Sequence, residues 1–566
     1  MSTAQGGRRK QLSPRGRLLM LAVFVLLIWA VVYPNFVVLA ESLSGDGTIT
    51  LRRYAEFFRT PSELRALWSS IWISAATVLL SALIGVPLAF LFARIEFAGR
   101  RVLGALAAMP VLLPPLVGVI AILFLYGESG IATRLVQSAL RLDAPPWRLY
   151  GGSAILAVHA YSMYVYFYLF TLAGLARLDP AVHEAAASLG AGRVRTLTRV
   201  TLPLLTPTLA GASLLTFMTS MGSFSAPYVL GGGFRVMTTQ IFSSKLQGET
   251  SMAMVETVML AAVSLLVLWP LARWEGSREY VAPGKGTQAA RVPVKSRWAA
   301  IGVPLIAGVG VALLLLPHLT LLLISLVPDG SWTTQTLPPR YSLENYAQLF
   351  GEARTFRPIV NSLLMASAAT FIAVAMALAV GQLVVRWRVR GRGALEAMLA
   401  LPWALPGTVL AIALATTFSV NQPWAGRFVL VGTAWILVMA YTLRVLPLTG
   451  RAALAGFRQL DPSLEEAAAS LGAGPWRTLR RVTIPGLLPA IAVGASLAFV
   501  TGLGEFVASI VLYTHRTRPI SIEILSQLRD FDLGAAAAYG VLLMLIVAAA
   551  FTLGQRWIQG GERSAG

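Results

Sequence analysis

Cysteine is absent from this 566-residue chain, and charged residues are scarce. Without cysteine there are no disulfides, no thiolate metal ligands and no thiol nucleophile. Asp, Glu, Lys and Arg make up 13% of the residues, about half the share found in soluble domains, whereas hydrophobic residues make up 56%. A long chain with so little charge is typical of a membrane protein and not of a series of soluble domains.

Sequence signatures of enzymes are also missing. The histidines are scattered at His159, His183, His318 and His515, so their spacing predicts neither a metal site nor a catalytic triad. The chain has no G-x-x-x-x-G-K-[ST] phosphate-binding loop, and the nearest match, GKGT at 284–287, lacks the upstream glycine. We therefore expect no enzyme activity and no cofactor. Any nucleotide-driven work has to come from another protein.

Long apolar runs are the main feature that the chain does have. Each is about 20 residues long, the length that a helix needs to cross roughly 30 Å of hydrocarbon. Twelve such runs in two sets of six predict an all-α polytopic membrane protein with twelve transmembrane helices. The first set lies near 18–40, 68–93, 103–126, 150–175, 203–225 and 252–272, and the second near 298–327, 359–385, 394–419, 428–450, 484–512 and 534–555.

The distribution of Lys and Arg predicts the orientation of these spans, because cytoplasmic loops carry an excess of both. With a cytoplasmic N-terminus, the two basic clusters RRKQLSPRGR at 8–17 and RWRVRGR at 386–392 both lie inside. We therefore expect a multi-pass protein of a bacterial inner membrane with both termini in the cytoplasm. The net charge of +21 then reports topology, and nucleic-acid binding is not expected. The first run is longer than the core of a signal peptide, so we expect it to remain as a span.

The two sets of spans are copies of one plan. Residues 179–207 and 461–489 are identical at 20 of 29 positions. An even number of spans separates them, which gives both copies the same orientation and makes this a parallel repeat. Weaker matches flank this region: SAAT at 74–77 and 367–370, and the proline pairs Pro110/Pro114 and Pro402/Pro406.

The repeat predicts the domain organisation. We expect a first six-helix repeat at 1–274 and a second at 298–566. The intervening stretch 275–297 is polar, basic and rich in Gly and Pro, as is typical of a linker. Because this stretch follows the sixth span, we expect it to be cytoplasmic.

The best-matched part of each half is a cytoplasmic loop after its fourth span. Each copy opens with Asp-Pro, which is typical of an N-cap followed by proline at the first helical position. The sequence EAAASLG that follows favours a helix, and its glycine, Gly190 or Gly472, suits a left-handed helix end. We therefore predict a short helix, a turn and a second short helix. Their small side chains would let another protein approach closely.

The spacing EAA---G at this place resembles the EAA motif of the permease subunits of ATP-binding-cassette (ABC) importers. With two copies and six spans each, the resemblance covers nearly the whole chain and implies the type I importer permease fold. In that family the loop forms a coupling helix, which sits in a cleft of the ATPase subunit. The resemblance implies ATPase docking for Glu184, Ala185, Ala186, Gly190, Glu466, Ala467, Ala468 and Gly472.

Arginines that follow each motif have two interpretations, which stay open. They can contact the same ATPase through charge-assisted hydrogen bonds, or they can anchor the loop to lipid headgroups. These residues are Arg193, Arg195, Arg199, Arg477, Arg480 and Arg481.

The resemblance also implies partners and a class of cargo. It implies two copies of an ABC ATPase subunit on the cytoplasmic face, membrane lipid around the spans, and an extracytoplasmic solute-binding protein. Fused two-half permeases resemble this chain most closely in systems for ferric iron, with thiamine, polyamine and aminoethylphosphonate systems as neighbours. The alternative of another class is an ion-coupled secondary transporter. Such a protein is expected to carry charged coupling residues at mid-membrane, and these spans have almost none.

Glu505 and Ser223, which align between the two halves, are a possible substrate gate. An ionisable residue within a span is a functional-site hypothesis, and counting from Pro485 at about 1.5 Å per residue places Glu505 toward the outer mouth. A carboxylate there suits a cationic or metal cargo. A solvated interfacial acid or a contact with the binding protein remains open. We expect Glu256 to be in contact with water and Arg444 to reach water from the inner end of its span.

Overall fold

The computed structural model describes residues 14–45, 48–276, 292–293, 296–332, 335–421 and 423–564. Most of the predicted linker at 275–297 therefore lies outside the described residues. The chain forms two compact units. Unit 1 comprises 1–51, 348–526 and 542–566, and unit 2 comprises 52–347 and 527–541.

Unit 1 is built from helices, apart from one antiparallel pair of two-residue strands, β1 and β2. Its elements are α1 (Pro14–Leu27), η1 (Ile28–Val32), α2 (Tyr33–Leu43), β1 (Ser44–Gly45), β2 (Thr48–Ile49), α17 (Ala353–Gly381), η4 (Gln382–Arg386), α18 (Arg392–Ala404), α19 (Gly407–Thr417), η5 (Pro423–Ala425), α20 (Ala434–Gln459), α21 (Pro462–Ser470), α22 (Pro475–Thr478), η6 (Leu479–Thr483), α23 (Ile484–Leu503), α24 (Val507–Leu512), η7 (His515–Thr517), most of α25 (Ile520–Arg529) and the later part of α26 (Leu533–Ser564).

Unit 2 is also helical, with one parallel pair of two-residue strands, β3 and β4. Its elements are α3 (Arg52–Arg59), α4 (Pro61–Arg94), β3 (Ile95–Glu96), α5 (Arg100–Leu106), η2 (Met109–Leu112), α6 (Pro115–Tyr126), α7 (Ile131–Ala139), α8 (Gly151–Arg177), α9 (Pro180–Ser188), α10 (Arg193–Thr196), η3 (Leu197–Thr201), α11 (Leu202–Met221), α12 (Ser225–Leu230), α13 (Met237–Leu246), α14 (Thr250–Gly276), β4 (Val292–Pro293), α15 (Arg297–Ser325), the first part of α16 (Glu344–Gly351) and the start of α26.

Within the described residues, eleven helices are long and apolar enough to cross a membrane. A twelfth span is completed by α18 and α19, which pass the same test together but are bent by 107° at the break between them. The predicted span at 394–419 corresponds to this bent pair. The expectation of an all-α polytopic membrane protein is confirmed.

Proline breaks the third span of each half at equivalent places. Pro114 precedes α6 with ψ of 147°, and Pro406 precedes α19 with the same ψ. Such extended backbone cannot continue a helix, and the ring removes the N–H that the helix would use. The repeated prolines seen in the sequence therefore mark a repeated break in the fold.

A stripe of small residues lets the second span pack closely in each unit. In α4 the buried side includes Ser70, Ser74 and Gly85, and a Cβ at Gly85 would meet the Tyr164 carbonyl oxygen of α8. Close backbone approach through small residues is typical of helix packing in membranes. In α17 the buried face is shifted by one residue relative to α4 when the two SAAT sequences, at 74–77 and 367–370, are aligned. Ala366 is buried in α17, whereas Ser367 is exposed.

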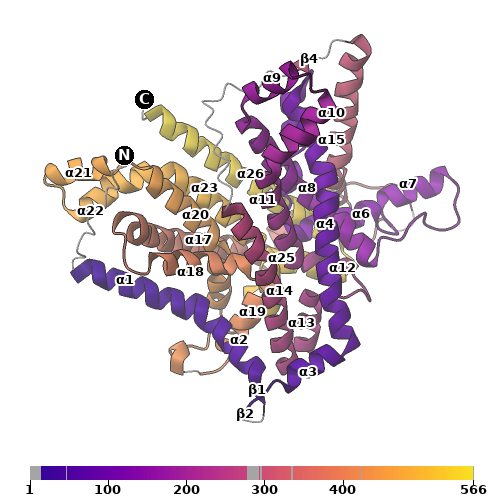
Figure 1. Cartoon of the computed structure of the whole chain (residues 1–566). Helices are drawn as coiled ribbons and strands as arrows, with labels where there is room; N and C mark the ends of the chain where they lie inside the picture. The colour runs from indigo at the N-terminus through magenta and orange to yellow at the C-terminus, as the bar shows by residue number, and fades with distance from the viewer. Residues whose placement is uncertain are drawn as a thin grey trace. The chain divides into compact units, whose positions relative to one another are not determined.

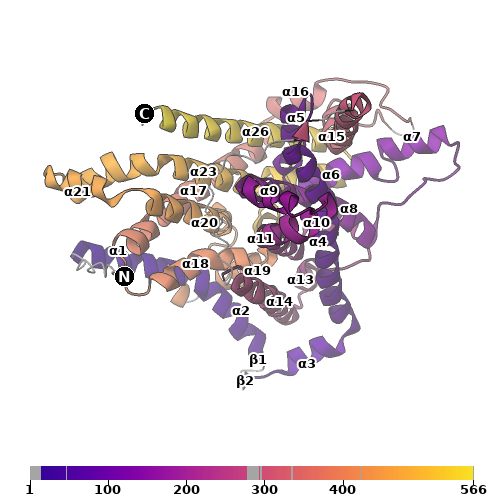
Figure 2. The same ribbon diagram turned by 45° about the horizontal axis from the view of Figure 1, so that its top comes forward.

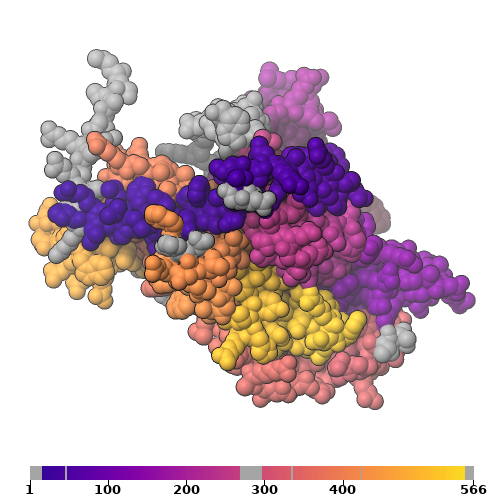
Figure 3. All heavy atoms as spheres, turned by 90° about the horizontal axis from the view of Figure 1, so that it is seen from below, coloured from indigo at the N-terminus to yellow at the C-terminus, as the bar shows by residue number. Residues whose placement is uncertain are grey.

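The first span of each half packs into the unit formed mainly by the other half. In unit 1, Val23 and Leu27 of α1 join a core cluster with residues of α17 to α20. In unit 2, Ala307 and Val311 of α15 join a cluster with Tyr164 of α8. Figure 3 shows indigo atoms of α1 and α2 beside orange atoms of the later chain. Neither compact unit therefore coincides with one linear half of the sequence.

Candidate docking loops and gate residues

The first EAA loop folds as the sequence predicts. The Asp179 carboxylate accepts a hydrogen bond from the Ala181 N–H at 2.9 Å, which caps α9. The helix ends at Ser188, and Gly190 takes a φ of +74°, a left-handed conformation that costs glycine little. α10 follows from Arg193. α9 and α10 lie together near the top of Figure 1.

The second EAA loop has the same geometry in unit 1. The Asp461 carboxylate accepts from the Ser463 N–H at 2.9 Å, and this hydrogen bond holds the pKa of Asp461 below its usual value. Gly472 takes a φ of +81° after α21, and α22 begins at Pro475. α21 and α22 form the left-hand tip of their unit in Figures 1 and 2. Two sequences that are alike therefore give two loops that are alike.

Each loop presents an exposed leucine at the same position. Leu189 is 87% exposed and Leu471 is 88% exposed. A Cβ added at Gly190 or Gly472 would meet no atom within 4 Å, so the turn beside each leucine is open. An exposed leucine at the same position is therefore a feature that the two loops share.

The predicted docking residues are not all on the surface. Glu184, Ala185, Glu466 and Ala467 are exposed. Ala186, in contrast, is buried. Ala186 is therefore less accessible to a partner than Glu184 and Ala185, and its role in ATPase docking stays a prediction. Ala468 is half-buried, and the six arginines that follow the motifs are exposed.

The residue directly before each EAA glutamate was missed by sequence reasoning. In the first loop this is His183, whose Nε2 lies 2.9 Å from an Arg94 guanidinium nitrogen and 3.0 Å from the Thr201 hydroxyl. Because arginine can only donate, Nε2 of His183 acts as the acceptor. Burial, together with the charge of Arg94, lowers the pKa of His183 below its ordinary value.

The second loop has the corresponding arrangement with a different residue. The Glu465 carboxylate accepts from Arg386, at 3.2 Å, and from the Thr483 hydroxyl, at 2.8 Å. Arg386 also donates to the Leu460 carbonyl at 2.9 Å, next to the cap of α21. Comparing the copies for identity could not find this site, because His183 and Glu465 differ. What the two residues share is their contacts, because each lies against one arginine and one threonine.

Ser223 lies where α11 ends and α12 begins, and it faces a buried histidine. Its hydroxyl is 2.9 Å from Nε2 of His159 in α8. Nδ1 of the same ring is 3.1 Å from the Ser220 hydroxyl and 3.2 Å from that of Thr77. The residue is thus part of a polar cluster that links α4, α8 and α11 within unit 2.

Glu505 occupies the equivalent break between α23 and α24. It is only 6% exposed, and its Oε2 lies 3.4 Å from Nε of Arg444. Its Oε1 accepts from the Ala508 N–H at 3.1 Å. Glu505 is therefore not a free carboxylate. Arg444 does not lie near the inner end of its span as expected, because α20 continues to Gln459 and leaves this residue in the middle of the helix, facing Glu505.

Glu256 is buried and not in contact with water as the sequence suggested. It faces Glu63, which is also buried. Ser244 donates to Oε1 of Glu256 at 2.7 Å, and the Gln240 amide donates to Oε1 of Glu63 at 2.8 Å. Gln240 and Ser244 are one turn apart on α13, so this helix holds both carboxyl groups in place.

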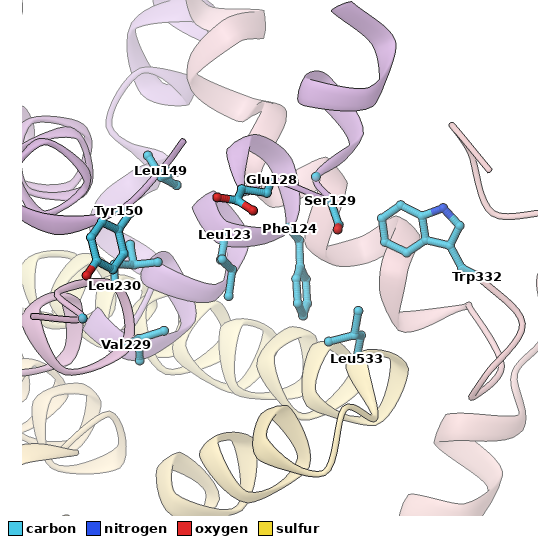
Figure 4. Close-up of a pocket in the computed structure, with 13 residues that line it drawn as sticks. Leu123, Phe124, Glu128, Ser129, Leu149, Tyr150, Val229, Leu230, Trp332 and Leu533 are labelled. Carbon is cyan, nitrogen blue, oxygen red and sulfur yellow. The ribbon is translucent and has the colours of Figure 1, made fainter. Parts of the chain in front are cut away.

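A cavity of about 410 Å³ opens in unit 2, away from Ser223 (Figure 4). Leu123 and Phe124 of α6 and Leu533 of α26 contribute apolar lining, and Tyr150 and Trp332 contribute aromatic rings. Its acidic residue, Glu128, pairs with exposed Arg148 at 3.8 Å. Within the described part of the chain, no group of three or more His, Cys, Asp or Glu residues could hold a metal ion.

Comparison with known proteins decides the family. Residues 85–273 and 369–560 both match the family model described as "Binding-protein-dependent transport system inner membrane component". The chain belongs to this family. It is an ABC importer permease with two fused repeats, and the parallel six-helix plan inferred from its sequence is confirmed.

Some relatives of this permease match nearly all of its length, and others match about a third of it. A probable ABC transporter permease of Sinorhizobium fredii is 31% identical over 93% of both chains. A ferric transport system permease of Actinobacillus pleuropneumoniae is 27% identical over 96% of this chain and 78% of its own length. A sulfate transport system permease of Escherichia coli is 33% identical, but over 32% of this chain and 69% of its own length.

Family membership sets the coarse functional picture. Members of this family are inner-membrane components of transport systems. A separate ATPase and a substrate-binding protein are the partners that such a permease requires.

Proposed function

We propose that this permease passes a small solute, best identified as ferric iron, from an extracytoplasmic binding protein to the cytoplasm. Two copies of a separate ABC ATPase drive it, one docked on each EAA loop. The observation that carries this proposal is the matching pair of loops, each with a capped helix, a left-handed glycine and an exposed leucine. Two equal sites call for two equal partners.

The proposed docking contacts are the accessible members of each motif. Glu184 and Ala185 in the first loop, with Glu466 and Ala467 in the second, present a carboxylate beside a small side chain. The open turns at Gly190 and Gly472 leave room for the wall of a cleft. Ala186 and Ala468 support the loop from within.

The proposed organisation keeps two repeats at 1–274 and 298–566, joined by a cytoplasmic linker at 275–297. Both termini are then cytoplasmic, and so are both EAA loops. The basic clusters near the N-terminus and after the second span of the second half support this orientation, because positive residues favour the inner face.

Ferric iron is proposed as cargo because the ferric transport system permease of Actinobacillus pleuropneumoniae is similar to this chain over 96% of its residues. Thiamine, a polyamine or aminoethylphosphonate are the alternative cargoes. Proteoliposomes that contain the permease and its ATPase, with the cognate binding protein outside, provide the test. Uptake of radioactive iron that depends on internal ATP is the expected result, and uptake of one of the other solutes instead would refute the iron assignment.

The proposed gate consists of Ser223 and Glu505 at the two helix breaks. In the second half Glu505 pairs with Arg444, and in the first half the Ser223 hydroxyl lies 2.9 Å from Nε2 of His159. Each half therefore contributes one polar gate position at its own helix break. A carboxylate that is paired with an arginine holds a cationic solute less tightly than an unpaired carboxylate would.

Docking is tested by reversing the charge on both loops. In Glu184→Arg/Glu466→Arg we expect normal insertion and loss of the ATPase during detergent purification, because a like charge replaces each carboxylate. The matched control is Glu249→Arg/Glu352→Arg, which reverses two exposed carboxylates on the loops predicted to lie outside. Unchanged ATPase stoichiometry in the first variant would show that the EAA loops are not the docking sites.

A secondary transporter remains the alternative of another class, and the same vesicles separate the two. Accumulation of cargo from an ion gradient alone, with ATP withheld, would contradict the ABC mechanism. Accumulation only with ATP inside is the expected result.

A further inference from the structure

In each EAA loop, one side chain of the first helix contacts residues at the ends of two membrane spans. In unit 2, His183 on α9 meets Arg94 at the last residue of α4, and Thr201 directly before α11. In unit 1, Glu465 on α21 meets Arg386, at the end of the turn that follows α17, and Thr483 directly before α23. The second and fifth spans of each half thus meet at one residue of the loop.

These contacts lie on the inner side of the loop, opposite the exposed docking residues. Thr201 and Thr483 are buried, and the side chains of Arg386 and Glu465 are 9% and 19% exposed. His183 and Glu465 directly precede Glu184 and Glu466, so successive residues of one helix point in different directions. One residue faces outward to a partner, and its neighbour faces inward to the spans.

A nine-residue helix has too little stability of its own to transmit force, because isolated helices this short are marginal in water. Its position is determined by its tertiary contacts. A hydrogen bond to an arginine is charge-assisted and stronger than a neutral one. The contact of His183 with Arg94, and that of Glu465 with Arg386, therefore fix the docking helix more firmly than the surrounding alanines can.

We propose that His183 and Glu465 are coupling joints, which transfer movement of the docked ATPase from each EAA helix to the second and fifth spans of the same half. This assignment rests on the proposed docking of the ATPase on the EAA loops. Both are positioning residues, since neither is placed where it would touch cargo or nucleotide. We call the residues that contact each joint its socket. Arg94 and Thr201 form the socket of His183, and Arg386 and Thr483 form that of Glu465.

The two joints have different chemistry. The second half has an ion pair, and Arg386 also donates a hydrogen bond to the Leu460 carbonyl at the start of the loop. The first half has an imidazole acceptor beside the cation. Because the sockets are alike, a glutamate should fit at position 183 and complete an ion pair with Arg94. This gives a gain-of-contact variant as well as loss-of-contact variants.

The experiment separates docking from coupling. His183→Ala/Glu465→Ala is purified with its ATPase and placed in proteoliposomes. We expect the ATPase to co-purify at wild-type stoichiometry with near wild-type basal hydrolysis. Transport, and stimulation of hydrolysis by loaded binding protein, should each fall about tenfold, within the range of typical coupling free energies between sites. Coupled transport at the wild-type rate would overturn the proposal, and so would loss of the ATPase from the complex.

Two further variants keep the test decisive if the alanine variant folds poorly. Thr201→Val/Thr483→Val preserves shape and removes only the hydroxyl groups of the sockets, so a partial loss of coupling with intact docking is expected. His183→Glu should retain coupling in an otherwise normal chain. If the valine variant transports normally, or if His183→Glu uncouples hydrolysis from transport, the joints are not what connects the loop to the spans.

Failure of this proposal can be distinguished from failure of the proposed function. If Glu184→Arg/Glu466→Arg retains the ATPase, docking itself is misassigned. If that variant loses the ATPase while the joint variants remain fully coupled, docking stands and only the coupling joints are refuted.

Discussion

Arg444 and Glu505 form an ion pair inside unit 1, with 3.4 Å between Nε and Oε2. The side chain of Glu505 is almost fully buried, whereas that of Arg444 is 28% exposed. Glu505 also caps the break before α24 through the Ala508 N–H. One carboxylate therefore serves both the charge balance and the backbone of the proposed gate.

Removing this carboxylate should destabilise the permease. Glu505→Ala leaves Arg444 without its counter-charge and the Ala508 N–H without its acceptor, at a cost of about 3 kcal/mol, the lower end for a broken buried pair because Arg444 is partly exposed. Glu505→Gln keeps an oxygen for both donors and should lose clearly less. Thermal unfolding in detergent measures both variants. Equal losses would show that the ionic contact is not the source of stability.

The equivalence of the two breaks predicts that the ion pair can be transplanted. Ser223 aligns with Glu505, and Ser162 aligns with Arg444. Ser223→Glu alone introduces a partly buried carboxylate and should lower the unfolding temperature. Ser223→Glu/Ser162→Arg should recover part of that loss, because the new arginine supplies the counter-charge. The coupling energy from the double-mutant cycle is the readout, and a value near zero would mean that the two breaks differ in geometry.

Acid should weaken the joint of the first half. The pKa of His183 lies below its ordinary value because burial and Arg94 disfavour the imidazolium, so the unfolded loop binds a proton more readily than the folded loop does. The contribution of this joint is then fully present above about pH 6.5, and it is lost as the pH falls through the lowered folded-state pKa. Arg94 and Thr201, which face the ring, do not change protonation in this range.

Binding-protein-stimulated hydrolysis, measured between pH 8 and pH 5.5, tests this dependence. The wild-type permease should lose stimulation toward the acidic end. His183→Gln, which keeps a hydrogen-bonding side chain that does not titrate, should show a flatter profile. An identical decline in both proteins would place the acid-sensitive group elsewhere.

The carboxyl pair Glu63 and Glu256 should tolerate loss of one charge. Two buried carboxylates that face each other repel when both are ionised. The nearby Arg235 donates to the Gln240 side chain at 3.1 Å. Glu256→Gln removes that repulsion and keeps an acceptor for Ser244, so the unfolding temperature should stay the same or rise. Glu256→Leu leaves the Ser244 hydroxyl unpaired and should cost about 1–2 kcal/mol. A marked loss with glutamine would show that the negative charge itself is required.

The sequence was sufficient for features that depend on local chemistry. The Asp-Pro start and the glycine stop of each EAA loop predict α9 and α21 because a cap and a left-handed turn need those residue types. Pro114 and Pro406, in contrast, were recognised in the sequence only as markers of the repeat, and the break that follows from each was not predicted.

Features that depend on distant contacts could not be obtained in this way. Arg444 was misplaced because α20 extends beyond the apolar run that marks its span. Glu256 was placed in water because part of its buried surroundings comes from α4, which is distant in sequence, and because the fold packs the preceding helix α13 against it. His183 and Glu465 were invisible to a search for identity, because the repeat keeps their partners and changes the residues themselves.

The placement of α1 in the core of unit 1 has a consequence for biogenesis. Val23 is inserted into the bilayer early in synthesis, yet its packing neighbours near Met365 leave the ribosome much later. Until then the face of α1 that packs in the core has no protein partner. Contacts between residues so far apart in sequence form slowly, and slow formation allows misassembly. Because both halves are on one polypeptide, α1 stays covalently linked to the helices that it packs against. Each chain therefore supplies its own packing partners for α1.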